Sequence, residues 1–397
     1  VWQGQELDLT EFRAPDLAGD LQKRDFTVNA MAMDLQALCH QERLAIIDPW
    51  GGREDLAAGR LQLLLAENFR ADPLRLLRAF RFAATHGLAL TGQVREAITT
   101  YGPLIQGMAG ERLHQEMFRL LAVPEAGPVL PQMEELGFLD HLLPELADMK
   151  GVAQNGYHHL DVFQHSLSAV AELERVLAAP AEYFQATAPY VAEYARQNAK
   201  PVLLKLAALF HDAGKPATQH FRADQERYTF YHHEWLGMEI FQQVASRWRF
   251  SLEEKRTVCR LIELHMRPFH LLPEFQEGKL SQRALGRFIK AARPELPGVL
   301  ALAMADSLAG QGPTKPPDSE RLLAAFADQV MAFLKERLEP LEQRPRLLTG
   351  ADLIKELHLE PGPAFRRLLL AVEEAALEGS VQDRRQALAL VAELLKA

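Results

Sequence analysis

From about residue 53 onward, apolar residues recur at helical spacing along most of the chain. Leu74, Leu77 and Phe80 lie three residues apart, and residues 113–121 repeat this spacing further along. Apolar positions three or four residues apart form one face of an amphipathic helix. Proline and glycine interrupt these segments at Pro103, Pro124, Gly127-Pro128 and Pro144, as expected where helices end. The pattern therefore predicts a mainly α-helical protein.

Residues 1–52 are the only strand-rich part of this pattern. Residues 7–12 alternate apolar and polar side chains, and residues 45–49 form a short apolar run that ends in proline before the turn at residues 51–52. Both patterns are typical of β-strands. A sheet that is stable alone needs about three strands, and only one or two are evident here. We therefore expect the sequence to begin partway through an α+β domain.

Two loop-like stretches divide the helical part. One lies near residues 146–156 and is rich in Gln, Asn and Gly, and the other is the Gly- and Pro-rich segment 310–317. These breaks predict four segments. They are the last part of an α+β head at 1–52, a helical neck at 53–148, a helical domain at 149–312 and a helical tail at 313–397.

Composition excludes several classes of protein. The chain has 397 residues, of which 48% are hydrophobic and 24% charged, and these are ordinary globular values that argue against disorder. It has no apolar run of about 18 residues, so no membrane span is expected. Cys39 and Cys259 are too few for a disulfide framework or a cysteine zinc site. With a net charge of −9, any contact with nucleic acid requires local basic faces. We expect a cytoplasmic protein.

Histidines and aspartates suggest a metal site. The apolar run 203–210 ends in His211-Asp212, and Gly214 and Lys215 follow. A buried imidazole and carboxylate are costly without a cation between them, and both are ligands for divalent metals. Lys215 is a candidate contact for a phosphate oxygen. The alternative is that such histidines only fill the core.

The order of His165, His211-Asp212 and Asp306 resembles the signature of the HD phosphohydrolase superfamily, over roughly residues 157–310. The resemblance implies a helical domain in which one or two metal ions (Mn, Ni, Co, Fe or Mg) activate water against a phosphoester. It also implies a second-metal pair at His233 and His265, with His232 competing for the first position. A structural role is favoured for the remaining histidines of this region, His158, His159, His220 and His270.

A second set of motifs lies in the first third of the chain. The four segments are Lys-Arg-Asp-Phe-Thr-Val-Asn-Ala at 23–30, Ile-Asp-Pro-Trp-Gly-Gly at 47–52, Ala-Asp-Pro-Leu-Arg-Leu-Leu-Arg at 71–78 and Glu-Arg-Leu at 111–113. In this order they resemble the class II tRNA nucleotidyltransferase and poly(A) polymerase family. Lys23 and Ala71 depart from the Arg and Glu that are usual in the family, and Ala71 is expected to loosen the positioning of its neighbours.

Asp72, Arg75 and Arg78 are candidates for reading a nucleobase. Their spacing of three residues predicts one shared helix face. A carboxylate accepts hydrogen bonds and a guanidinium donates them. Cytosine and adenine each present an amino donor beside a ring-nitrogen acceptor, so one Asp–Arg pair reads both bases. Guanine and uracil leave the pair unsatisfied, at a cost of about 1–3 kcal/mol per contact. The alternative is a solvated helical salt bridge.

The family resemblance implies an enzyme that adds C, A or both to the tRNA 3′ end from CTP and ATP with Mg²⁺. It assigns base reading to Asp72 and Arg75 and implies a nucleotide site that also includes Arg24, Asp25, Asn29 and Arg78, with Arg24 and Asn29 near the triphosphate and sugar. The family takes its catalytic metal ligands from Gly-Gly and Asp-x-Asp segments upstream of these motifs, and Asp8 resembles only a supporting third acid. We therefore expect the sequence as given to lack the catalytic metal pair. The alternatives are an HD phosphohydrolase as the only retained activity, or a non-catalytic RNA-binding protein.

The tail and the neck carry weaker indications of RNA contact. Residues 348–353 and 360–363 resemble the closing segment of long nucleotidyltransferases that carry an HD domain. The neck carries four arginines, Arg70, Arg75, Arg78 and Arg81. They predict a positively charged face that could bind tRNA through its shape and its phosphates. The sequence leaves open whether CCA, CC, A or poly(A) is added, and it leaves open the oligomeric state.

Overall fold

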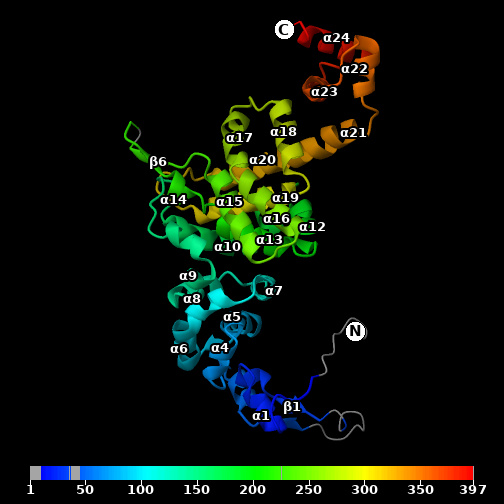
Figure 1. Ribbon diagram of the computed structural model, residues 1–397. Helices are drawn as coiled ribbons and strands as arrows, with labels where there is room; N and C mark the ends of the chain where they lie inside the picture. The colour runs from blue at the N-terminus through cyan, green and yellow to red at the C-terminus, as the bar shows by residue number, and fades with distance from the viewer. Residues whose placement is uncertain (1–9, 35, 37–44, 225, 397) are drawn as a thin grey trace.

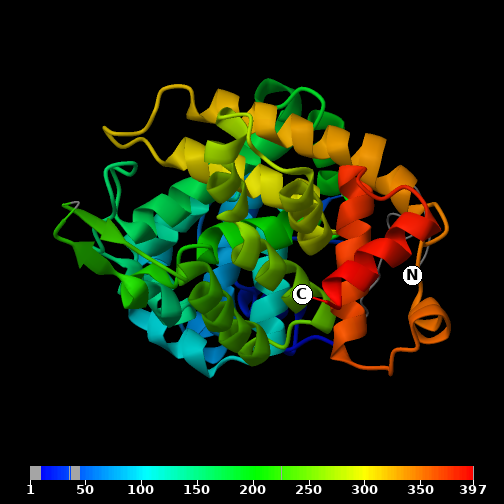
Figure 2. The same ribbon diagram turned by 90° about the horizontal axis from the view of Figure 1, so that it is seen from above.

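The protein is an elongated, curved stack of helices (Figure 1). The computed structural model describes residues 10–34, 36, 45–224 and 226–396. The earliest described residues lie at one end of the stack, a large helical bundle forms the middle, and three helices lie at the other end. Seen from above, these last helices lie to one side of the bundle (Figure 2). The expectation of a mainly helical protein is confirmed.

Short elements form the first end of the stack. They are α1 (Leu17–Gln22), η1 (Thr27–Asn29), β1 (Ala32–Met33), β2 (Ile46–Ile47), α3 (Gly52–Ala57), β3 (Arg60–Leu61) and α4 (Glu67–Ala71). Strands β1 and β2 are antiparallel, with Ala32 opposite Ile47, which confirms the strand expected at 45–49. The strand expected at 7–12 lies mostly outside the described residues, and residues 10–12 are not in a strand.

The neck consists of α5 to η3. Its elements are α5 (Leu74–His86), β4 (Ala89–Leu90), α6 (Gly92–Tyr101), η2 (Gly102–Gly107), α7 (Gly110–Leu121), α8 (Val129–Glu135), α9 (Phe138–Leu142) and η3 (Pro144–Met149). Helices α5 and α7 pack together through buried side chains such as Leu77, Phe80, Leu113 and Met117. These are the positions that the helical spacing predicted.

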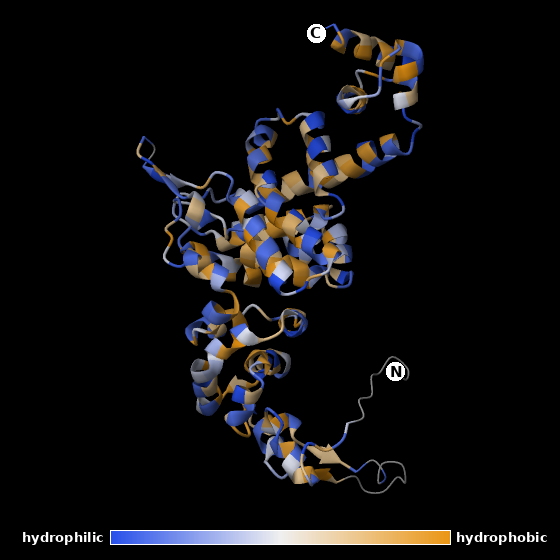
Figure 3. Cartoon of the chain, viewed as in Figure 1, coloured by the Kyte–Doolittle hydropathy of each residue, from blue (hydrophilic) through white to orange (hydrophobic). Residues whose placement is uncertain are grey.

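The central bundle begins with α10. Its elements are α10 (Val162–Ala178), α11 (Pro180–Tyr183), α12 (Ala188–Arg196), α13 (Lys200–Phe210), α14 (Lys215–Thr218), β5 (His220–Arg222), β6 (Arg227–Thr229), α15 (His233–Arg247), α16 (Leu252–Leu264), α17 (Arg267–Gln276), α18 (Gln282–Ala292) and α19 (Leu296–Ala309). Helix α10 packs along α19 and α13. Helix α19 is buried on nearly all sides, as expected for a helix that is apolar all round, and Figure 3 shows the apolar interior of this bundle.

Two strand pairs lie outside the strand-rich region that the sequence predicted. Strands β3 and β4 are parallel, and β5 and β6 form an antiparallel hairpin. In the hairpin the rings of Phe221 and Tyr228 lie opposite each other, with centroids 5.2 Å apart. Strands of two or three residues are too short to show a period of two in the sequence, so pattern analysis missed them.

The final segment divides between two cores. Its elements are α20 (Ser319–Phe333), the π-helical η4 (Leu334–Leu338), α21 (Glu339–Glu342), α22 (Gly350–Leu357), α23 (Pro363–Glu378) and α24 (Arg384–Leu394). Helix α20 buries Leu323, Phe326 and Val330 in the main core, where it packs against α17 and α19. A separate core begins at Leu348. The segment expected as a tail from residue 313 therefore gives its first helix to the central bundle.

A buried ion pair joins the neck to the bundle. The Lys205 ammonium on α13 lies 2.7 Å from the Glu174 carboxylate on α10, and it donates to the carbonyls of Leu121 and Val123 at 2.8 Å. Glu174 also accepts the backbone N–H groups of Ala126 and Gly127. Every polar group of this pair has a partner, as a buried charge requires, so the end of α7 is fixed to the bundle. Among the described helices, none is long and apolar enough to cross a membrane.

Candidate metal centre and nucleotide site

The side chains that the sequence predicted as metal ligands meet in the central bundle. His165 lies in the first turn of α10, and His211-Asp212 directly follows α13. His233 begins α15, His265 directly follows α16, and Asp306 lies near the end of α19. All are buried, with exposed fractions between 0% and 7%. Five helices therefore contribute one cluster of imidazoles and carboxylates.

Gly214 allows the turn after α13 to pack against the start of α15. A Cβ atom at this position would lie 2.2 Å from the His233 carbonyl oxygen, which no side chain tolerates. The glycine therefore lets the His211-Asp212 turn and His233 come together. Of the two candidates His232 and His233, the structure places His233 in the cluster, whereas His232 is exposed and precedes the helix with a positive φ of 66°.

Distances within the cluster are short. The Nε2 of His165 lies 3.0 Å from the Asp306 Oδ1 atom, and the Nε2 of His211 lies 3.2 Å from the Asp212 Oδ2 atom. The Nε2 of His233 lies 3.3 Å from both the Asp212 Oδ1 atom and the Nε2 of His265. Two overlapping groups bring their ligand atoms within 4.8 Å of one another, namely His165, His211 and Asp306, and His211, Asp212 and His265.

Hydrogen bonds to the backbone fix three of the imidazoles. The Nδ1 atoms of His211, His233 and His265 each lie 2.7 Å from a carbonyl oxygen three residues earlier. A carbonyl only accepts, so each Nδ1 carries a proton and each Nε2 faces the cluster, where its lone pair is available to a metal once Nε2 carries no proton. This is the arrangement that metal-ligating histidines adopt.

Unsatisfied atoms show that the cluster fits a divalent cation. The Nε2 of His211 and both carboxylate oxygens of Asp212 are buried and make no hydrogen bond among the described residues; the contacts of Asp212 with Lys215, His211 and His233 are close ion pairs. Unpartnered buried acceptors are costly, and a cation coordinated by imidazole nitrogen and carboxylate oxygen satisfies them. The donor set therefore fits the metal site that the sequence predicted.

The electrostatics of the cluster favour positive charge between the carboxylates. Burial raises the pKa of Asp212, but His211 and the Lys215 ammonium outweigh it and hold this pKa well below its usual value. Burial likewise raises the pKa of Asp306, and hydrogen bonds with His165 and His211 outweigh it. Burial lowers the pKa of His211, but the two carboxylates raise it to about 10. Both aspartates are thus held as carboxylates, the form that binds metal.

Lys215 lies at the edge of the cluster, where the sequence predicted a phosphate contact. Its ammonium lies 2.6 Å from the Asp212 Oδ2 atom and donates to the Gln154 Oε1 atom at 2.7 Å. Three of the four histidines for which a structural role was favoured, His159, His220 and His270, are exposed. His158 is the exception. Its ring lies 4.5 Å from that of His165, and burial, with Lys215 and His165 nearby, lowers its pKa to about 3.

The nucleotide-reading motifs also come together, at the junction of α4 and α5. The Arg78 Nε donates to the buried Asp25 carboxylate at 2.6 Å, and the Asn29 amide donates to the other oxygen of Asp25. The Arg75 guanidinium donates to the carbonyls of Lys23 at 2.8 Å and Arg24 at 3.5 Å. Burial lowers the pKa of Arg75, and the nearby Asp25 and Asp72 partly offset this effect. Two arginines of α5 therefore hold the segment that carries the first motif.

The position of Asp72 shows that one prediction, the shared helix face, was wrong. It does not share a helix face with Arg75, because α4 ends at Ala71 and α5 begins at Leu74. Pro73 explains the break, since proline disfavours the helical conformation of the residue before it, and Asp72 adopts φ −139° and ψ 89°. The Asp72 Oδ2 atom pairs with Arg112 at 3.0 Å, and its Oδ1 atom is buried with no hydrogen-bond partner in the described part of the chain. Asp8 lies outside the described residues.

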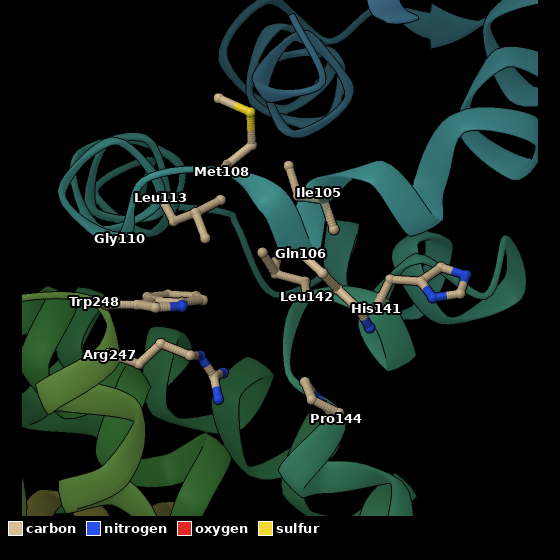
Figure 4. A pocket seen from close by; sticks show the side chains of 10 residues that line it. All are labelled: Ile105, Gln106, Met108, Gly110, Leu113, His141, Leu142, Pro144, Arg247 and Trp248. Carbon is tan, nitrogen blue, oxygen red and sulfur yellow. The ribbon is translucent and has the colours of Figure 1, made fainter.

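A separate cavity of about 310 Å³ lies between the neck and the bundle (Figure 4). Ile105, Met108, Leu113 and Leu142 line it from the neck, and Trp248 extends into it from the bundle side. Leu113 of the Glu-Arg-Leu motif lines it, but none of the candidate metal ligands or base-reading residues does, so we place neither of the two sites in it.

Comparison with known proteins agrees with the order of the motifs. Three family models match this chain. They are the poly A polymerase head domain over residues 3–62, a probable RNA- and SrmB-binding site of polymerase A over 87–150, and the HD domain over 162–330. An A-adding tRNA nucleotidyltransferase of Deinococcus radiodurans is 32% identical over 382 residues, which cover 95% of this chain and 79% of the relative. The chain belongs to the tRNA nucleotidyltransferase family.

Other members of the family show similar agreement. A CC-adding tRNA nucleotidyltransferase of Thermus thermophilus is 34% identical over 391 residues, with 97% of this chain and 79% of the relative covered. Among solved structures, the apo form I of a CCA-adding enzyme matches with a TM-score of 0.60 and 17% identity, over 96% of this chain and 74% of that chain. At this identity the match supports the fold alone. The family that the motifs predicted is therefore confirmed, with its HD domain.

Proposed function

We propose that this member of the tRNA nucleotidyltransferase family adds C, A or both to the 3′ end of tRNA from CTP and ATP. An A-adding and a CC-adding relative are 32% and 34% identical to this chain. The proposal therefore includes both C and A as the added nucleotide. Structural neighbours include a CCA-adding enzyme with CTP and another with tRNA. When bound, Mg²⁺ neutralises charge on the triphosphate and activates the attacking hydroxyl. Asp8 is the candidate supporting acid.

Asp72 and Arg75 are proposed to select the base. The unpartnered Oδ1 atom of Asp72 offers an acceptor for the amino group that cytosine and adenine share. The Arg75 guanidinium has five N–H donors and donates to two backbone carbonyls, so donors remain for a ring nitrogen. The observation that carries the proposal is this buried acceptor without a partner, three residues along the chain from an arginine whose guanidinium is fixed to the segment 23–24.

The test is the selectivity of nucleotide addition. In the complete enzyme, with its upstream catalytic acids, we expect the double variant Asp72→Ala, Arg75→Ala to lose at least roughly 30-fold of its preference for CTP and ATP over GTP and UTP, because it loses two contacts worth about 1–3 kcal/mol each. The measurement is kcat/KM for each of the four nucleoside triphosphates on tRNA that lacks its 3′ end. Asp72→Ala alone removes no backbone contact and separates base reading from folding. Arg119→Ala, an exposed change on α7, is the control, and an unchanged preference in the double variant contradicts the proposal.

The buried cluster supports a second activity, metal-dependent phosphohydrolysis. Its residues would hold one or two divalent ions, which supply an activated water and polarise a phosphoryl oxygen when bound. Lys215 would hold a phosphate oxygen at the edge of the cluster. We expect hydrolysis of a phosphomonoester or a cyclic phosphodiester with added Mn²⁺, Ni²⁺ or Mg²⁺, measured as released phosphate or opened ring. A complete metal screen without turnover contradicts this second activity.

A further inference from the structure

His158 stands next to the metal centre but outside the signature that predicted it. It lies four residues before α10, and the match to the HD family model begins at residue 162. The rings of His158 and His165 meet edge to face, with an interplanar angle of 82° and centroids 4.5 Å apart. In the sequence His158 is the first of two adjacent histidines in a polar loop. The local sequence therefore gives no indication that its ring contacts a metal ligand.

A distant segment encloses His158. The Gly312 N–H donates to the Tyr157 carbonyl at 2.7 Å, and the Thr314 N–H donates to the Gly156 carbonyl at 3.0 Å. A Cβ atom on Gly312 would lie 2.2 Å from the Gly156 carbonyl oxygen, and one on Gly310 would lie 3.3 Å from the His158 Nδ1 atom. The glycines of the segment 310–314 thus let it pack directly over the loop that carries His158, next to the end of α19 that carries Asp306.

The hydrogen bonds of the ligand histidines show what is missing at His165. The Nδ1 atoms of His211, His233 and His265 all have carbonyl partners at 2.7 Å. The Nδ1 of His165 has none among the described residues. Since the Nε2 of His165 faces Asp306 at 3.0 Å, its Nδ1 must carry the proton when Nε2 binds a metal. A metal-ligating histidine nearly always donates this N–H to an acceptor, so an acceptor is required here.

His158 is the candidate for that acceptor. Its own Nδ1 atom is also buried and unpartnered in the described part of the chain. We propose that His158 is a positioning residue of the metal centre, whose Nδ1 lone pair accepts the Nδ1–H of His165 through one bridging water. This pairing satisfies both nitrogens at once and fixes the tautomer and the orientation of the His165 ring. The inference rests on the proposed HD metal centre.

Three substitutions at His158 test the hydrogen bond. His158→Ala removes ring and acceptor, His158→Phe keeps the ring and removes the acceptor, and His158→Gln keeps an acceptor without the ring. The measurement is the Kd of the purified full chain for Mn²⁺ or Ni²⁺ by calorimetry. We expect Ala and Phe to weaken binding by about 10- to 100-fold, the range typical for loss of such an outer partner. Gln should restore it to within about threefold of wild type.

Controls separate this inference from the function on which it rests. His159→Ala changes the exposed neighbour and should leave the Kd unchanged, and circular dichroism of each metal-free variant reports folding. A wild-type affinity in His158→Phe, or a His158→Gln variant as weak as Ala, overturns the role of His158 and leaves the metal centre standing. A wild-type protein that binds neither metal overturns the metal centre itself.

Discussion

The candidate metal centre and the proposed base-reading region differ in how completely the chain satisfies its own polar groups. In the metal centre, six side chains from five helices converge with exposed fractions of 7% or less. In the base-reading region, the side chains of Asp72 and Arg112 are 32% and 48% exposed, and Arg75 is bound to backbone carbonyls. The side chains of one site are buried, and those of the other are partly exposed at the surface.

The cost of burying charge explains this difference. A cluster of buried carboxylates and imidazoles is tolerable only when each group has a partner or a shared cation, so folding itself brings the metal ligands together. A site that reads a base must leave hydrogen-bonding groups free until the base arrives. In this region, backbone carbonyls hold Arg75 and one exposed ion pair holds Asp72. An exposed ion pair costs little to rearrange.

The largest effect that tests this comparison is expected at Asp212, which contacts His211, His233 and Lys215 within the cluster. Asp212→Asn keeps the shape but removes the negative charge, so we expect the Kd for Mn²⁺ or Ni²⁺ to rise by more than about 100-fold. If the two sites are independent, the preference for CTP and ATP in nucleotide addition should not change. Calorimetry and the four-nucleotide assay measure the two effects, and a parallel loss of base preference would show that the sites are coupled.

The sequence predicted which side chains form the buried cluster better than it predicted the surroundings of Asp72. The order of His165, His211-Asp212 and Asp306 was sufficient, because a buried ligand set leaves its side chains little choice of position. At Asp72 the spacing argument was wrong, since Pro73 ends the helical path and Arg112, 40 residues away, provides the ion-pair partner. His158 was assigned a structural role because the segment 310–314 that encloses it lies about 150 residues further along the chain. Contacts between distant segments leave no local pattern to read.

The smallest predicted effect concerns Arg112 and sharpens the account of the base reader. Its guanidinium on α7 pairs with the Asp72 Oδ2 atom at 3.0 Å, whereas the buried Oδ1 atom has no hydrogen-bond partner among the described residues. Arg112→Ala removes this restraint, so we expect a loss of C and A preference of about 3- to 10-fold, smaller than in the double variant because both reading groups remain. The free energy of unfolding should change by less than about 1 kcal/mol, since the pair is exposed.

Two measurements decide whether Arg112 acts by orienting Asp72. The four-nucleotide assay should show reduced discrimination with kcat/KM for ATP and CTP falling further than that for GTP and UTP. Thermal unfolding should place Arg112→Ala close to the Arg119→Ala control on the same helix, whose ion pair with Glu116 has an exposed guanidinium. The ion pair with Arg112 is the only side-chain restraint on Asp72 that this variant removes. If Arg112→Ala kept the wild-type preference for CTP and ATP, the backbone around Pro73 alone would orient Asp72. Asp72 would then be fixed by the backbone as firmly as the side chains of the buried cluster are fixed by their surroundings. The two sites would then differ only in how far their side chains are buried.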